Sequence, residues 1–88
     1  MATDNEIRSN AKIGDNYLRF RGITYQRVVK VTRLTAARIY LEDGGCISSL
    51  NGNTVKTSEG SKAFHYLPAT EERLAKIANR EYRLAEDN

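Results

Sequence analysis

Arginine and tyrosine side chains alternate with apolar residues in the first half of the chain. Of all the residues in the chain, these are the best suited to bind a ligand. Residues 16–41 hold six basic residues and no acidic one. Guanidinium and ammonium groups neutralise phosphates, and tyrosine rings stack on exposed bases. The same residue types are enriched at the energetic centres of protein interfaces. The candidate contact residues are Tyr17, Arg19, Arg21, Arg27, Lys30, Arg33, Arg38 and Tyr40.

Charge is distributed unevenly along the chain. The 88 residues include 14 Lys and Arg against 11 Asp and Glu, a net charge of +3. Residues 1–67 hold 10 basic and 6 acidic side chains, and residues 68–88 hold 4 and 5, so the two parts carry +4 and −1. The small net charge therefore conceals a window of +6 over residues 16–41. Such a window suits a nucleic acid, an acidic protein, or a solvated face that only keeps the protein soluble.

The sequence contains few residues that could act in catalysis. His65 is the only histidine and Cys46 the only cysteine, and nothing in the sequence brings them together or beside Ser48 or Ser49. A nucleophile needs such an adjacent base. One His and one Cys are too few for a structural zinc site, and no glycine loop has the Gly-x4-Gly-Lys-Ser/Thr spacing that holds phosphates. We expect a non-enzymatic protein with no catalytic residue, metal or cofactor, in which Cys46 is a small buried apolar residue.

Length and cysteine content narrow the class of protein further. A chain of 88 residues has room for one small domain and none for a deep substrate cleft. A single cysteine cannot form an intramolecular disulfide, which favours a reducing cytoplasm. No apolar run approaches the ~20 residues that span a bilayer, so no membrane association is expected.

Short alternating segments separated by turn residues predict strands over residues 14–67. The expected strands are residues 16–21, 23–34, 37–42 and 46–50, with further short ones at 54–57 and 63–67. Asp43-Gly44-Gly45 is a strong hairpin turn. In residues 16–21, Leu18 and Phe20 alternate with arginines. If these apolar side chains face the core, the arginines and tyrosines project outward together.

The C-terminal part has the pattern of an amphipathic helix. Thr70 is a good N-cap, and Glu71 and Glu72 place negative charge in the first helical turn. We therefore divide the chain into a flexible arm (1–13), a small strongly bent antiparallel barrel of five or six strands (14–67) and a helix that packs on or extends from it (68–88). The expected core is Leu18, Phe20, Ile23, Val28, Val31, Ile39, Leu41, Ile47, Val55, Phe64, Leu67, Leu74 and Ile77. Both Val28 and Val31 reach it only if a bulge or bend interrupts residues 23–34.

Three segments resemble small uncharacterised proteins of tailed bacteriophages. They are the strand from Val28 to Arg33, the hairpin from Arg38 to Gly44 and the proline-initiated helix start from Pro68 to Glu72, and the resemblance spans about residues 25–77. It implies a mainly β, Src-homology-like small barrel and an origin in a phage, so that the protein would act in the host cytoplasm. It implies no particular activity, because small barrels have unrelated functions.

These observations predict a binding module. The leading hypothesis is that the basic strand face binds DNA or RNA, mainly through phosphates and therefore with little sequence preference. The alternative is a phage-type protein that docks on an acidic host protein and inhibits or redirects it, through the same face or through the C-terminal helix.

Overall fold

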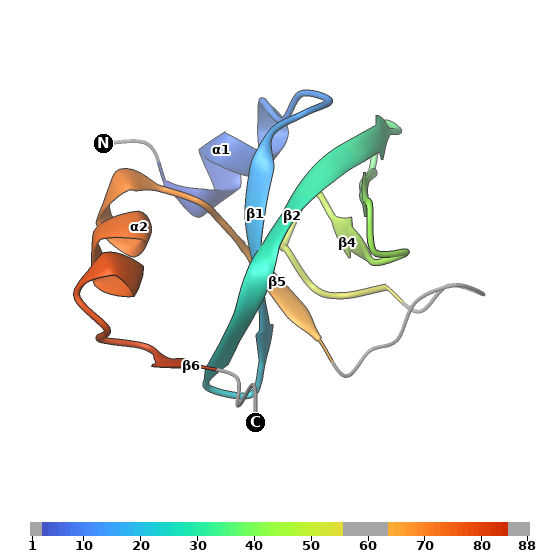
Figure 1. Ribbon diagram of the computed structural model, residues 1–88. Helices are drawn as coiled ribbons and strands as arrows, with labels where there is room; N and C mark the ends of the chain where they lie inside the picture. The colour runs from blue at the N-terminus through green and yellow to red at the C-terminus, as the bar shows by residue number, and fades with distance from the viewer. Residues whose placement is uncertain (1–2, 56–63, 85–88) are drawn as a thin grey trace.

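The fold is built on one antiparallel sheet that curls into half of a barrel. The computed structural model describes residues 3–55 and 64–84. The strand order is β4-β3-β2-β1-β5, and the short β6 pairs in parallel with the start of β2 (Figure 1). The elements are α1 (Asp4–Ser9), β1 (Asn16–Arg21), β2 (Thr24–Leu34), β3 (Arg38–Leu41), β4 (Cys46–Ser48), β5 (His65–Pro68), α2 (Glu71–Ala78) and β6 (Arg83–Leu84). The predicted mainly β fold with a C-terminal helix is confirmed.

The long strand β2 belongs to both halves of the sheet. Its first part pairs with β1 and its last part with β3, and the register slips once in each pairing. The slips leave Gln26 and Thr32 as extra residues, and such bulges bend and twist a strand. Between them, Val29 and Val31 point into the core, whereas Val28 is exposed. The prediction that Val28 and Val31 share the core was therefore wrong for Val28.

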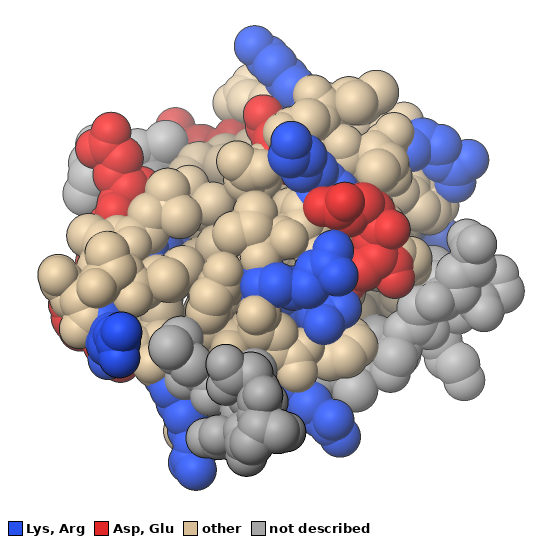
Figure 2. Space-filling view, viewed as in Figure 1, with Lys and Arg blue, Asp and Glu red and all other residues tan. Residues whose placement is uncertain are grey.

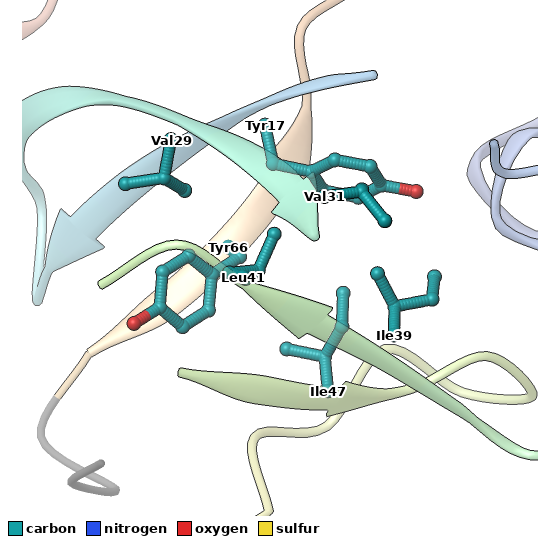
Figure 3. Packing of buried hydrophobic residues seen from close by; sticks show 7 residues of the cluster. All are labelled: Tyr17, Val29, Val31, Ile39, Leu41, Ile47 and Tyr66. Carbon is teal, nitrogen blue, oxygen red and sulfur yellow. The ribbon is translucent and has the colours of Figure 1, made fainter. Parts of the chain in front are cut away.

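The core lies on the concave face of the sheet. Figure 3 shows its seven buried side chains, which come from β1 to β5: Tyr17, Val29, Val31, Ile39, Leu41, Ile47 and Tyr66. Tyr17 pairs with Val29, and both are buried. The face of β1 that the sequence predicted to be outside is therefore the inside of the half-barrel.

The opposite face of β1 is also covered. Leu18 and Phe20 are buried although they point away from the main core. The Phe20 ring stacks on His65 of β5 at 5.8 Å between centroids and meets Tyr82 edge-on at 5.1 Å. Because both faces of this strand are buried, its alternation could not tell inside from outside. Of the predicted core, Ile23 and Leu74 are exposed, at 75% and 44%.

Residues 1–13, predicted as a flexible arm, contain the helix α1. Thr3 and Glu6 form a capping box, in which each side chain accepts a hydrogen bond from the other residue's backbone N–H. Asp4 binds Arg73 of α2 through two hydrogen bonds of 2.7 and 2.9 Å, and the Arg8 side chain is buried. The helix is too short to show an apolar stripe, so only the capping box could have predicted it.

The C-terminal helix is shorter than predicted. Thr70 caps α2 as expected, since its hydroxyl accepts from the Arg73 backbone N–H. The helix ends at Ala78, and Arg80 adopts a positive φ of 59° that turns the chain back toward β2. Tyr82, which falls in the range predicted as helix, lies beyond α2 and packs on Phe20. Within the described residues no helix is long and apolar enough to cross a membrane.

The turn between β3 and β4 is shaped by two glycines with different requirements. Gly44 has a φ of +89°, as the turn prediction requires. Gly45 is buried, and a β-carbon there would overlap the Tyr66 hydroxyl and lie 2.6 Å from its Cζ. This residue must therefore lack a side chain for a steric reason.

We predict that Gly45→Ala lowers the free energy of unfolding by about 2–3 kcal/mol, because the buried Tyr66 must move. The matched control is Gly22→Ala, which has open space around it and a φ of +62°. It should cost only about 1 kcal/mol. Urea denaturation followed by circular dichroism measures both values, and equal losses in the two variants would contradict the steric account.

Candidate functional site

The structure divides the predicted contact residues into three places. Tyr17 and Arg19 lie in the interior, Arg21 and Arg27 lie exposed near the β1–β2 turn, and the others lie on the convex side of β2 and β3. Register explains the division, because paired residues share a sheet face. Arg27 pairs with Arg19, whereas Arg33 pairs with Tyr40. The continuous basic face expected from the sequence does not form.

Arg19 belongs to a buried network and not to a contact surface. Its Nη1 donates to Asp43 Oδ2 at 3.1 Å, and the side chains of the two residues are 19% and 6% exposed. The same oxygen accepts from the Tyr66 hydroxyl at 2.8 Å, and Asp43 Oδ1 accepts from the Gly45 N–H at 2.8 Å. The guanidinium also lies 4.3 Å from the centroid of the Phe64 ring. The prediction that Arg19 contacts a ligand is wrong, because Asp43, Tyr66 and Phe64 occupy it.

Tyr17 was expected as a stacking residue, and this expectation is also wrong. Its side chain is 1% exposed, so no base can reach the ring. Burial raises the pKa of Tyr17 to about 12, and the nearby Asp15 adds to that effect. The hydroxyl therefore stays protonated inside the half-barrel.

The ionisation of Asp43 reflects the balance between burial and hydrogen bonding. Burial alone would raise the pKa of this carboxyl, but the donors on Gly45, Tyr66 and Arg19 outweigh it and hold the pKa below its usual value. Burial and the adjacent Asp43 carboxylate raise the pKa of Tyr66. Asp43 is thus a charged acceptor and Tyr66 a neutral donor at neutral pH.

Three of the other basic residues and one tyrosine form what we call the outer patch, which consists of Lys30, Arg33, Arg38 and Tyr40. The extra residue at Thr32 shifts the register so that Arg33 lies opposite Tyr40, and the Arg33 Cζ is 4.1 Å from the centroid of the Tyr40 ring. Arg38 lies on the same side of β3, two residues before Tyr40. The three basic side chains are exposed and the tyrosine is half-buried.

Cys46 lies beside Tyr40 of the outer patch, on the neighbouring strand β4. It pairs with Tyr40 and is fully buried, as the sequence predicted. Burial raises the pKa of its thiol, against the opposing effects of Arg38, a hydrogen bond with Tyr40, and Arg33. The thiol therefore stays neutral, and the two arginines lie close enough to influence it.

Acidic side chains interrupt the basic surface. Glu42 lies beside Lys30, whose backbone N–H donates to Glu42 Oε2 at 2.8 Å. Figure 2 shows Lys and Arg side chains in separate groups, with an acidic cluster next to basic ones. The outer patch is thus a small cluster of cations next to Glu42. Its positive electrostatic field is weaker than the charge of +6 over residues 16–41 implied.

A groove that the sequence did not predict lies between α2 and the convex side of β1 and β5. It consists of two adjoining hollows of about 490 and 510 Å³ that share Leu67 and Tyr82. One hollow is lined mainly by apolar and aromatic side chains, including Phe20, Ile23 and His65. The groove depends on the return of the chain through β6, for which no local sequence signal exists.

His65 lies on a different strand from the other residues considered for catalysis. It is on β5 against Phe20, whereas Cys46 and Ser48 are on β4, with Cys46 beside Tyr40. In the part of the chain that the structure describes, no three His, Cys, Asp or Glu side chains cluster in a way that could hold a metal ion.

Comparison with known proteins finds no match. No family model, curated protein or solved structure is similar to this chain at a significant level. The resemblance to bacteriophage proteins stays a prediction from the sequence, and the site is argued from its geometry alone.

We predict that Asp43→Asn lowers the free energy of unfolding at pH 7 by about 3 kcal/mol, because Arg19 loses its buried counter-charge. The pKa of Asp43 is depressed in the folded state, so its stabilisation is complete above the unfolded value of about 3.9 and is lost as the pH falls through the folded value. The difference between wild type and variant should therefore shrink below about pH 3.9. Urea titrations at several pH values measure it, and a difference that does not change with pH would contradict the ionic role.

Proposed function

We propose that this protein is a non-enzymatic binding module that binds nucleic acid through the outer patch. The observation that carries the proposal is the Arg33 side chain held on the Tyr40 ring, with Arg38 on the same convex face of paired strands. Cations and an aromatic ring on a rigid sheet are the combination that binds phosphates and bases. Under this proposal the protein acts in the cytoplasm, which for a phage-encoded chain is that of the host cell.

The cations of the outer patch are available to a ligand. Within the described residues, Lys30, Arg33 and Arg38 take part in no ion pair, whereas Arg19 and Arg73 are each bound to an aspartate. When an exposed cation without a carboxylate partner neutralises a phosphate, counterions condensed on the nucleic acid are released. With three such cations, contacts to a single strand should give a slope of log affinity against log salt of about −2.

We predict that Arg33→Gln combined with Arg38→Gln weakens binding of a short labelled oligonucleotide and makes the salt slope shallower by about 1.4. The matched control is Lys76→Gln combined with Arg80→Gln, which removes the same charge on and after α2 and should leave the slope unchanged. Fluorescence anisotropy at several salt concentrations measures both.

Absence of oligonucleotide binding to the wild type at low salt would refute the proposal. Equal weakening by the two double variants would assign the binding to net charge and not to the outer patch. Circular dichroism of each variant checks that the fold is retained.

A second function is favoured by the groove beside α2. One of its two hollows has an apolar and aromatic lining that includes the exposed Ile23, which is typical of a surface that receives another protein. We propose docking on a host protein as this second candidate, with the groove in place of the basic face as the contact surface.

We predict that Ile23→Asp in the groove strongly reduces capture of a stoichiometric partner from nuclease-treated host lysate. Ile23 lines the groove and is 75% exposed, so the fold should tolerate the change. The Arg33→Gln and Arg38→Gln variant is the control and should still capture the partner. If the groove variant captures as much partner as the wild type, the groove is not the docking surface.

A further inference from the structure

Phosphate binding requires only a positive charge, but the Arg33 guanidinium is also held over the Tyr40 ring. We infer that the ligand of the outer patch is a single-stranded nucleic acid, with one base stacked on the Arg33 guanidinium above the Tyr40 ring. This inference rests on the proposed function, since it names the class of nucleic acid that the outer patch takes.

The Arg33 guanidinium lies between the Tyr40 ring and solvent. Its Cζ is over the ring, 4.1 Å from the centroid. The Arg33 side chain is exposed, so a ligand can reach the guanidinium from the side away from the ring. A guanidinium is planar and delocalised, and it stacks on aromatic rings as well as binding phosphates. A base can therefore extend the stack that the protein has already begun.

Neighbouring strands hold the Tyr40 side chain in place. Tyr40 is half-buried on β3 between Arg33 on one neighbouring strand and Cys46 on the other. Cys46 is fully buried and is the strand partner of Tyr40. A side chain fixed in this way loses little conformational freedom on binding, so the surface is preorganised for a ligand.

A second arginine lies over an aromatic ring, but unlike Arg33 it is not accessible to a ligand. Arg19 also lies over an aromatic ring, at 4.3 Å from the Phe64 centroid. Its guanidinium is largely buried and bound to Asp43, so it presents no open side. Of the two stacked arginines described in the structure, Arg33 alone is exposed.

The geometry favours exposed bases over a duplex. In a duplex the base faces are covered by their neighbours, and base edges are read by elements that enter a groove. The outer patch lies on a sheet face, where it can meet a base only if that base is unstacked. Arg38 is two residues from Tyr40, about 6–7 Å along the strand, within reach of a phosphate beside the stacked base.

The test compares three labelled DNA probes of equal length at low salt. They are a single strand of mixed sequence, the same backbone with abasic sites in place of nucleotides, and a hairpin duplex. The abasic probe keeps the phosphates and lacks the base faces. Stacking of one base should make the wild type bind the single strand about fivefold or more tightly than the abasic probe.

Conservative variants separate stacking from charge. Arg33→Lys keeps the charge and removes the plane, so it should abolish the preference for the single strand over the abasic probe. Arg38→Lys is the matched control and should keep the preference. Tyr40→Leu, checked for folding by circular dichroism, should reduce the preference as Arg33→Lys does.

The outcomes distinguish this inference from the function on which it rests. If no probe binds at low salt, the proposed function fails. If the single strand and the abasic probe bind equally, or if the duplex binds most tightly, binding by the outer patch stands and the single-strand inference is overturned. A loss of preference in the Arg38→Lys variant as large as that in Arg33→Lys would also overturn it.

Discussion

The carboxylate of Asp43 joins the two ends of the strand order. It follows β3, near one edge of the sheet, and it accepts hydrogen bonds from Arg19 on β1 and from Tyr66 on β5 at the other edge. A five-stranded sheet curls around a core only if distant strands are held near each other, and this ion pair does so from within. Loss of either partner would leave a buried charge unpaired, which is strongly destabilising. The residue after the turn must also be glycine, because there is no space for a β-carbon at Gly45. Asp43 thus fixes the turn after β3 and also connects that turn to β1 and β5, the strands that close the other side of the core.

The sequence predicted the strands but not which face of each strand lies inside. Alternation in residues 16–21 correctly separated Tyr17 and Arg19 from Leu18 and Phe20, and it correctly predicted that Leu18 and Phe20 are buried. It wrongly placed Tyr17 and Arg19 on an outer face, because their side of β1 lines the inside of the half-barrel. Both faces of β1 are covered, and the acid that neutralises Arg19 lies 24 residues away along the chain. Local patterns carry no information about such a partner. The N-terminal helix is a different case, since the capping box from Thr3 to Glu6 was a usable local signal.

For the candidate site, the residues could be predicted but their arrangement could not. Arg38 and Tyr40 alternate with Ile39 and Leu41, and these two pairs do lie on opposite sides of β3. The stacking of Arg33 on Tyr40 depends on the extra residue at Thr32, and a bulge in a strand rich in β-branched residues has no fixed sequence signal. The groove depends on Arg80, whose positive φ ends the helical direction and lets Tyr82 return to Phe20.

The contact between Asp4 and Arg73 orders events during synthesis of the chain. The two residues are 69 positions apart, and α1 has six residues, too few to be stable alone. When the ribosome has made α1, its anchor on α2 does not yet exist, so the helix docks only after 69 further residues have been added. Until Arg73 is made, α1 and the part of β5 that it contacts are open to chaperones and proteases.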